Sequence, residues 1–251
     1  MVYVTGDCHA DFGKFSVRHF PEQRKMSRGD IVIVCGDFGL WHNDAAERGR
    51  LEGLARRAFT IVFVDGNHEN FDRLYSDEFP TVDFYGGKAH RIRENIYHLK
   101  RGYVFEFEGK SFFAFGGAKS HDISDGILDR KDFASDDEFK RVIRAANRLG
   151  LMCRVNHISW WKQELPTREE MDFGKAQLAA HGNKVDFIIS HCCPQTIASI
   201  NGYTEPDILT QYFDEIARDN QFDKWFFGHY HDNRTTYLQY VMRYDKIERV
   251  L

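Results

Sequence analysis

The residues best suited to chemistry in this sequence are aspartate, asparagine and histidine side chains that directly follow short apolar runs. They occur in five groups along the chain: Asp7 and His9, Asp37, Asn67 and His68, His191, and His229 and His231. Imidazole is a good ligand for Zn, Fe, Ni and Mn, whereas carboxylate and amide oxygens suit harder cations. If these side chains converge, they form a site for divalent metal ions.

The apolar runs that precede these groups have the length and composition of buried β-strands. They are rich in β-branched and aromatic residues and span residues 2–5, 31–35, 60–64, 186–190 and 224–227. Continuous apolar runs of this length are typical of strands that are buried on both faces. Since ligands in open α/β sheets bind beyond the carboxyl ends of the strands, we expect the five groups to meet at one edge.

Helical and hairpin-like segments separate these strands and predict a mixed α/β fold. Helices are expected over 11–26, over 43–58, after the capping boxes that begin at Ser135 and Thr167, and over 206–218 with Pro206 in the first turn. Residues 81–116 and 235–250 are turn-rich and strand-like, as in β-hairpins. Residues 117–183 are mostly helical and polar, which predicts an insertion or cap on a single domain of residues 1–251.

The composition is that of a folded protein without a strong charge bias. The chain has 251 residues, of which 34 are Lys or Arg and 38 are Asp or Glu, so its net charge is −4. This value excludes a strongly cationic nucleic-acid coat and a polyacidic tail. No apolar run reaches the ~18 residues of a membrane span, the N-terminus does not resemble a signal peptide, and the five cysteines form no regular framework. We therefore expect a cytoplasmic protein with reduced cysteines and no membrane partner.

The five groups resemble the motif series of the calcineurin-like metallophosphoesterase superfamily. The resemblance rests on Asp7-Cys-His9, Gly36-Asp37, Gly66-Asn-His-Glu69, Ser190-His191 and Gly228-His-Tyr-His231. The Gly-Asn-His-Glu and Gly-His-x-His blocks are its most specific parts, and the match extends from residue 7 to residue 231. The resemblance implies a two-sheet β-sandwich flanked by helices, of the α-β-β-α type, with two metal ions at the strand ends.

The resemblance also implies a role for each of these residues. Asp7, His9, Asp37 and His231 would hold one ion, and Asp37, Asn67, His191 and His229 would hold the other. Asp37 would bridge the two ions, and His68, which directly follows a ligand, would be the catalytic imidazole. The ions would be divalent or trivalent, and the ligand set accepts Mn, Fe, Ni, Zn or Co.

These roles agree with the chemistry of phosphoester hydrolysis. Two ions ~3.5–4 Å apart can bridge a hydroxide and hold phosphoryl oxygens during in-line displacement. The two oxygens of Asp37 suit a bridge, and Asn67 offers a neutral oxygen that adds no negative charge. As an imidazolium, His68 would neutralise phosphoryl oxygens or protonate the leaving alcohol, an effect of ~10²–10⁴-fold.

The sequence departs from the protein phosphatases directly after Asp37. Those proteins continue as Gly-Asp-x-x-Asp-Arg-Gly, in which the second aspartate orients the catalytic histidine and the arginine binds phosphate. Here Leu40 and Trp41 occupy these two positions. This difference argues against a Ser/Thr protein phosphatase. Asp65 or Glu69 is an alternative partner for the catalytic histidine.

Four residues are candidate substrate contacts, namely Trp41, His42, Ser120 and His121. The first two would line the mouth of the site, although Trp41 suits a core position equally well. The other two belong to the block Gly116–Asp122, which resembles a block of poorly characterised bacterial and phage members, some of which also carry a Trp-Trp-x-x-Glu block, here 160–164. Small residues after a strand allow close approach to a phosphate, and a tight turn before the insertion is the alternative.

The sequence thus predicts a dinuclear metal-dependent phosphoesterase that hydrolyses phosphate mono- or diesters by a metal-bridging hydroxide. The alternatives are a nuclease or cyclic-nucleotide phosphodiesterase with the same site, and a non-catalytic metal-binding interaction module. The missing arginine penalises a dianionic monoester more than a diester, by ~1–3 kcal/mol, so we expect an aryl diester to react at least as well as its monoester. Lys119 or Arg154 of the insertion would reverse this order by replacing the arginine.

Overall fold

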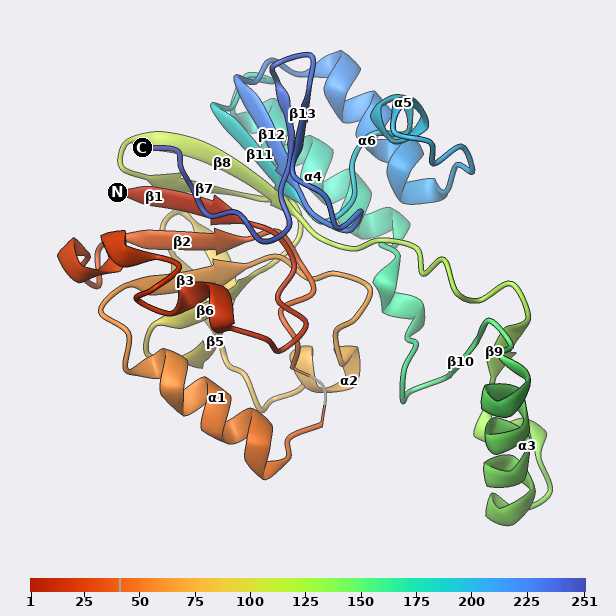
Figure 1. Ribbon diagram of the computed structural model, residues 1–251. Coiled ribbons are helices and arrows are strands. Elements are labelled where there is room, and N and C mark those ends of the chain that lie inside the picture. The colour runs from red at the N-terminus through yellow and green to blue at the C-terminus, as the bar shows by residue number, and fades with distance from the viewer. Residues whose placement is uncertain (41) are drawn as a thin grey trace.

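The computed structural model describes residues 1–40 and 42–251. Its strands form two main sheets that lie face to face, with helices on both outer sides (Figure 1). Apolar side chains of both sheets fill the space between them: Val4, Ile33 and Val62 come from one sheet, and Ile189 and Phe226 come from the other. This arrangement confirms the predicted α-β-β-α sandwich.

The first sheet has seven strands in the order β15-β1-β2-β3-β6-β5-β4. Their bounds are β1 Val2–Thr5, β2 Ile31–Val34, β3 Thr60–Phe63, β4 Thr81–Phe84, β5 Gly87–Arg93, β6 Ile96–Leu99 and β15 Glu248–Arg249. Strands β1, β2, β3 and β6 are parallel, and β15 and β5 run antiparallel to their neighbours. Every residue of β1, β2 and β3 is buried, which explains their continuous apolar sequences.

The second sheet has six strands in the order β13-β14-β12-β11-β8-β7. Their bounds are β7 Tyr103–Phe107, β8 Lys110–Phe115, β11 Phe187–Ser190, β12 Lys224–Phe227, β13 Arg234–Thr236 and β14 Tyr240–Met242. Strands β14, β12, β11 and β8 are parallel. The predicted hairpin of β7 and β8 turns at Glu108 and Gly109, whose positive φ angles of 52° and 72° are typical of a two-residue hairpin turn.

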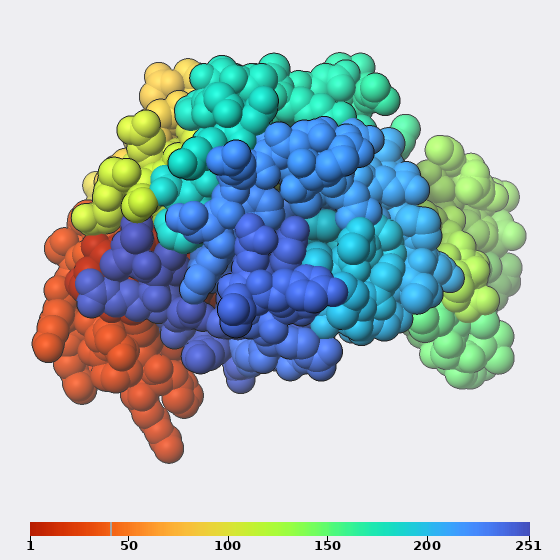
Figure 2. Space-filling view, turned by 90° about the horizontal axis from the view of Figure 1, so that it is seen from above, coloured from red at the N-terminus to blue at the C-terminus, as the bar shows by residue number. Residues whose placement is uncertain are grey.

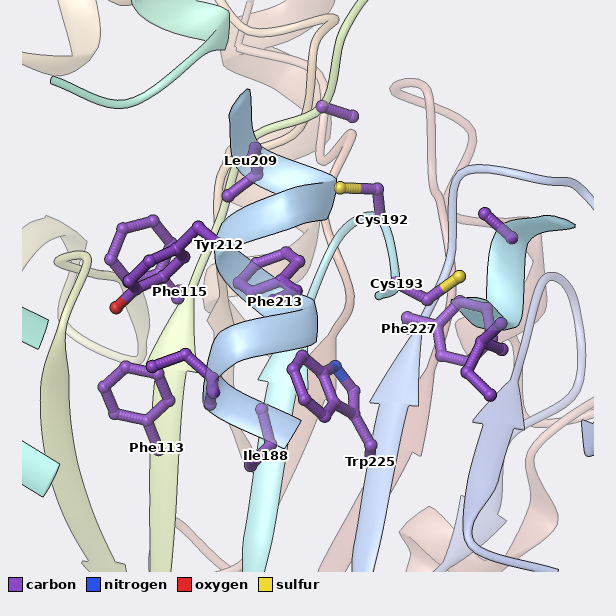
Figure 3. Close-up of a cluster of buried hydrophobic side chains, with 14 of the residues drawn as sticks. Phe113, Phe115, Ile188, Cys192, Cys193, Leu209, Tyr212, Phe213, Trp225 and Phe227 are labelled. Carbon is purple, nitrogen blue, oxygen red and sulfur yellow. The ribbon is translucent and has the colours of Figure 1, made fainter. Parts of the chain in front are cut away.

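Helices cover the outer face of each sheet. They are α1 (Ala45–Ala55) and α2 (Phe71–Leu74) beside the first sheet, and α4 (Arg168–Ala180), α5 (Gln195–Ile200) and α6 (Ile208–Asp219) beside the second. Figure 3 shows how α6 packs: Leu209, Tyr212 and Phe213 lie over Phe115 and Trp225 of the second sheet. The rigid sandwich holds the ends of the central strands in place.

The segment after β8 differs in part from the expected helical insertion over 117–183. Its elements are β9 (Gly126–Leu128), the 3-10 helix Arg130–Asp132, α3 (Asp136–Leu149), β10 (Cys153–Val155) and the 3-10 helix Lys162–Glu164. Residues 122–161, which we call the lobe, project from the body (Figure 1, Figure 2). In contrast, α4 belongs to the body, because Met171 and Leu178 pack in the core of the second sheet.

Other local expectations are met to different degrees. Thr167 begins α4 with the expected capping box, whereas Ser135 caps α3 through its side chain alone, because Glu138 accepts from the amide of Ala134. Residues 11–26 form only two short 3-10 helices, Gly13–Phe15 and Pro21–Lys25, because Gly13 and Pro21 interrupt the segment. Pro206 precedes Asp207, the N-cap of α6, so it lies outside the first turn. Within the described part of the chain, we find no helix with the length and apolarity needed to span a lipid bilayer.

Candidate metal centre

The carboxyl ends of strands from both sheets meet at one edge of the sandwich. The loop after β1 is bound to the loop after β2, because the amides of Cys8 and His9 donate to the carbonyl of Asp37 at 3.0 and 2.7 Å. The loop after β12 joins the first sheet through the amide of His229, which donates to Oδ1 of Asp7 at 3.0 Å. The amide of His68 donates to Oδ1 of Asp37, and Nδ1 of His191 donates to the carbonyl of Cys35, so all five predicted groups lie in one place.

The first cluster of candidate ligands consists of Asp7, His9 and His231. Oδ2 of Asp7 lies 3.1 Å from Nε2 of His231 and 3.6 Å from Nε2 of His9, and the two imidazole nitrogens are 3.0 Å apart. This Asp7 oxygen is buried and accepts no hydrogen bond from the described residues. A buried carboxylate oxygen without a donor, faced by two imidazole nitrogens, suits a cation.

The second cluster lies around Asp37 and His191. Nε2 of His191 is 3.3 Å from Oδ2 of Asp37 and 3.3 Å from Oδ1 of Asn67. The same Asp37 oxygen is 3.7 Å from Nε2 of His9, so it faces both clusters. Nδ1 of His191 donates to the carbonyl of Cys35 at 2.6 Å, which turns Nε2 toward the centre as in many metal-bound histidines.

His229 lies beside the second cluster. Its ring lies 5.0 Å from the ring of His191, and its Nε2 is 2.7 Å from Nε2 of His121. Burial and the nearby charge of His191 hold the pKa of His229 well below its usual range. His229 is therefore a neutral imidazole, and His121 lies directly beside it.

The charges of Asp37 and His191 depend on each other. Burial alone would raise the pKa of Asp37, but the imidazolium of His191 lowers it. Burial alone would lower the pKa of His191, but the carboxylates of Asp37 and Asp7 raise it. The centre thus places two carboxylates around one positive charge, and a metal ion would take over the role of the His191 proton.

The backbone at the centre is held in unusual conformations. His9, Asp37, His229 and His231 all have positive φ angles, between 47° and 67°. Left-handed conformations of such residues cost roughly 1–3 kcal/mol each and persist where the surrounding structure enforces them, often at functional sites. Four of the candidate ligands therefore carry backbone strain of this kind.

Two glycines of the sequence motifs make room for candidate ligands. A Cβ atom at Gly66 would lie 2.0 Å from Oδ1 of Asp37, and one at Gly228 would lie 2.1 Å from Oδ1 of Asp7. Real Cβ atoms do not approach other atoms so closely. Any larger residue at either position would displace a carboxylate of the centre.

His68 lies beside the centre and contacts an arginine of the lobe. Its amide donates to Oδ1 of Asp37 at 2.8 Å, and its ring nitrogens lie 3.3 and 3.0 Å from the Nη atoms of Arg154. Burial lowers the pKa of His68 to about 4, since the charge of Arg154 offsets part of the opposing effect of Asp37. The imidazole is consequently neutral near pH 7 in this state.

The two carboxylates considered as partners for His68 bond elsewhere. Asp65 accepts from His98 at 3.0 Å and from Nε of Arg101 at 2.9 Å. Glu69 accepts from the amides of Phe38 and Gly39 at 2.6 and 3.3 Å, and so holds the loop after Asp37. Among the described residues, Arg154 is a charged group that contacts the His68 ring.

Arg154 is one of the two cations that the sequence offered as replacements for the missing arginine. It lies on β10, is 8% exposed, and donates from Nε to Asp122 at 2.5 Å and from Nη1 to the carbonyl of Ser159 at 2.9 Å. Lys119 instead lines a cavity of about 490 Å³ on the side of His121. Sequence reasoning did not place Arg154 because a three-residue strand such as β10 gives little signal.

A cavity of about 350 Å³ lies between His68 and the lobe. It is lined by His42, His68, Asp122, Cys153, Arg154, Ile158, Ser159 and Trp161. His42, a candidate substrate contact, is therefore beside the centre, while Trp41 lies outside the described residues. Ser120, another candidate contact, is 1% exposed and bonds to Asn67 and Glu164. Glu164 was not anticipated as part of the site.

The cysteines near the centre are packing residues. Cys8, Cys35, Cys192 and Cys193 are all buried and free. Burial raises the pKa of the Cys8 thiol to about 12, which disfavours the thiolate that binds metals. None of the candidate ligand clusters among the described residues contains a cysteine.

Comparisons with known proteins identify the family to which the sequence is similar. The sequence model of the family described as calcineurin-like phosphoesterase matches residues 1–233, a range that contains every candidate ligand. Among solved structures, the chain is similar to the phosphopantetheinyl hydrolase PptH from Mycobacterium tuberculosis, with 17% sequence identity, coverage of 97% of this chain and 87% of that chain, and a TM-score of 0.41. The search of curated proteins gave no match.

Proposed function

The chain belongs to the calcineurin-like phosphoesterase family, and from this premise we propose that it hydrolyses phosphate mono- or diesters at a dinuclear metal centre. The observation that carries the proposal is the position of Asp37, whose Oδ2 faces His9 at 3.7 Å and His191 at 3.3 Å. One carboxylate oxygen thus stands between two sets of nitrogen and oxygen donors. Such a donor set suits Mn, Fe, Ni, Zn or Co.

The ligand sets expected from the sequence are compatible with these positions. Asp7, His9, Asp37 and His231 would hold one ion, and Asp37, Asn67, His191 and His229 would hold the other. When bound, the two ions would activate water and neutralise phosphoryl oxygens. Asn67 supports this use because its amide oxygen adds no negative charge where the phosphate must bind.

His68 and Arg154 would act on the substrate from the side of the lobe. His68 is neutral without substrate, and the negative charge of a phosphate would favour its protonated form, which can donate to the leaving oxygen. The guanidinium of Arg154 can donate paired hydrogen bonds to phosphate oxygens. Asp122 and the carbonyl of Ser159 hold that guanidinium in place before substrate arrives.

The position of Arg154 removes the reason for expecting a preference for diesters. That expectation rested on the loss of a phosphate-binding arginine, and the structure places another arginine next to His68. A guanidinium favours a dianionic monoester over a monoanionic diester. We therefore propose that monoesters are the better substrates.

The test is a panel of aryl monoesters, aryl diesters, cyclic nucleotides and single-stranded DNA, assayed with Mn, Fe, Ni, Zn and Co added separately. We expect metal-dependent turnover of the aryl monoester that a chelator abolishes. Preferential cleavage of cyclic nucleotides or DNA would support a phosphodiesterase or nuclease instead. Stoichiometric metal binding without turnover of any substrate would support a non-catalytic metal-binding module.

A further inference from the structure

Two sequence blocks that supply none of the candidate ligands meet behind Asn67. Ser120 belongs to the block Gly116–Asp122 after β8, and Glu164 ends the block Trp160–Glu164, which begins in the lobe and leads toward α4. Both side chains are 1% exposed. A carboxylate and a hydroxyl buried together beside a candidate metal ligand require an explanation.

Ser120 gives both of its protons to Glu164. Its amide donates to Oε1 of Glu164 at 3.0 Å, and its hydroxyl donates to Oε2 at 2.6 Å. A carboxylate only accepts hydrogen bonds, and a hydroxyl has a single proton. Oγ of Ser120 therefore has only lone pairs left for its next neighbour, which is Asn67.

The direction of this hydrogen-bond chain sets the orientation of the Asn67 amide. Nδ2 of Asn67 donates to Oγ of Ser120 at 3.3 Å, and Oδ1 points to the other side, 3.3 Å from Nε2 of His191. An amide binds a cation through its oxygen. If the amide turned over, its NH₂ group would face the cation, and two protons would oppose binding.

We propose that Glu164 and Ser120 are positioning residues, which fix the amide of Asn67 with its oxygen toward a divalent cation. The proposal rests on the proposed function, since it requires an ion at Asn67. It explains why the two blocks occur together in one chain: each supplies one member of a hydrogen-bonded chain that ends at the same ligand. Glu164 thereby couples the segment that follows the lobe to the metal centre.

The first test replaces Glu164 by glutamine, which has nearly the same shape. The glutamine NH₂ would donate to Oγ of Ser120, and the freed hydroxyl proton would then point at Asn67 and favour the turned amide. Groups that orient metal ligands typically contribute ~10–100-fold to metal affinity. We expect Glu164→Gln to weaken one of two Mn²⁺ affinities by this factor in calorimetric titration, and to leave the ion held by Asp7, His9 and His231 unchanged.

Glu170→Gln is the matched control. Glu170 lies on α4 near Glu164 in sequence, and its carboxylate contacts Arg101 at 3.4 Å and the amide of Thr167 at 2.8 Å. The Glu170→Gln variant should have the same two Mn²⁺ affinities as the unsubstituted protein. Ser120→Ala is a second variant, which removes the acceptor of the Asn67 amide and should cause the same selective loss.

The decisive measurement repeats the Glu164→Gln substitution in an Asn67→Asp background. Aspartate offers an oxygen on both sides, so its orientation no longer matters. We expect Glu164→Gln to cause no loss of Mn²⁺ affinity in that background. An equal loss in both backgrounds would show that Glu164 has a general structural role and would overturn the inference.

The inference and the proposed function fail in different ways. If the unsubstituted protein binds two Mn²⁺ ions and Glu164→Gln binds both equally well, the inference is wrong and the proposed function stands. If the unsubstituted protein binds no Mn²⁺ and hydrolyses no phosphoester, the proposed function is wrong, and the inference falls with it. Circular dichroism of each variant verifies that it is folded.

Discussion

Asp37 is the residue on which both clusters of candidate ligands depend. Its Oδ2 faces His9 and His191, while its Oδ1 accepts from the amide of His68. Asp37→Asn replaces one oxygen by an NH₂ group, and we expect it to reduce Mn²⁺ content at both positions and to abolish turnover. Metal analysis after equilibrium dialysis measures the loss.

The exposed Asp137 on α3 offers a control for the loss of one carboxylate. Asp137→Asn should bind as much Mn²⁺ as the unsubstituted protein. Full occupancy of either position in Asp37→Asn would show that the two ions do not share this residue.

His68 is expected to act on the substrate without holding an ion. Its ring contacts Arg154, although it also lies close enough to His9 and Asp37 to form a candidate ligand cluster with them. We predict that His68→Asn lowers kcat by ~10²-fold or more and leaves the metal content unchanged. If metal and activity fall together, His68 is a ligand.

At the residue scale, the sequence indicates why several candidate ligands share one edge of the sandwich. Asp7, Asp37 and His191 each lie within three residues of the end of a strand, and parallel strands carry such residues to a shared edge. Arg154 and Glu164 could not be assigned in this way. Each reaches the site from the segment between β8 and α4, through tertiary contacts that leave no periodic pattern in the sequence.

At the element scale, prediction succeeded where burial dictates the residue types. The strands β1, β2, β3, β11 and β12 lie within a residue or two of their expected bounds because they are short apolar runs with abrupt ends. Strands β9 and β10 have three residues each, and the paired residues are 27 positions apart in the sequence. Such pairing is not visible in local sequence.

The ends of β8 and β11 that lie far from the centre are joined by Asp186. Its carboxylate accepts from Nζ of Lys110 at 2.7 Å and from the amide and hydroxyl of Ser111, each at 2.8 Å. Partial burial raises the pKa of Asp186, but these hydrogen bonds outweigh burial and lower it below the usual value of 3.8. The folded protein therefore binds this proton less readily than the unfolded chain does.

The sign of this shift predicts a pH-dependent stability. The contribution of Asp186 is present above the pKa of the unfolded chain and is lost as the pH falls through the lower pKa of the folded state. Asp186→Asn should thus lower the free energy of unfolding at pH 7, and the difference should shrink as the pH is reduced below about 4. Urea denaturation at a series of pH values measures this difference. Asp83→Asn is the control, because Asp83 is exposed and pairs with Lys88. A difference that is constant with pH would contradict the prediction.

At the scale of the whole molecule, the lobe meets the body at the centre. Asp72 of α2 accepts from Nε1 of Trp161 at 2.7 Å and contacts Nδ1 of His157 at 2.8 Å. Nη2 of Arg101 donates to the carbonyl of Gln163 at 2.7 Å, and Arg101 is itself paired with the buried Asp65. These contacts place β10 so that Arg154 reaches His68. A sequence without a charge bias or a repeat gives no indication of such docking.

The preference between monoesters and diesters is therefore a property of how the lobe is placed. Arg154→Gln removes one charged donor, and a hydrogen bond to a charged group contributes about 1.5–3 kcal/mol, so kcat/KM for an aryl monoester should fall by ~10–100-fold. The loss for the matching diester should be smaller, because that substrate carries one charge fewer.

Arg130→Gln is the control, since Arg130 lies on the same lobe and pairs with Asp136 on its surface. The measurement compares kcat/KM for the monoester and the diester side by side with saturating Mn²⁺. Equal losses for both substrates would mean that Arg154 acts by docking the lobe and not by binding phosphate. A diester preference in the unsubstituted protein would mean that no cation has replaced the missing arginine.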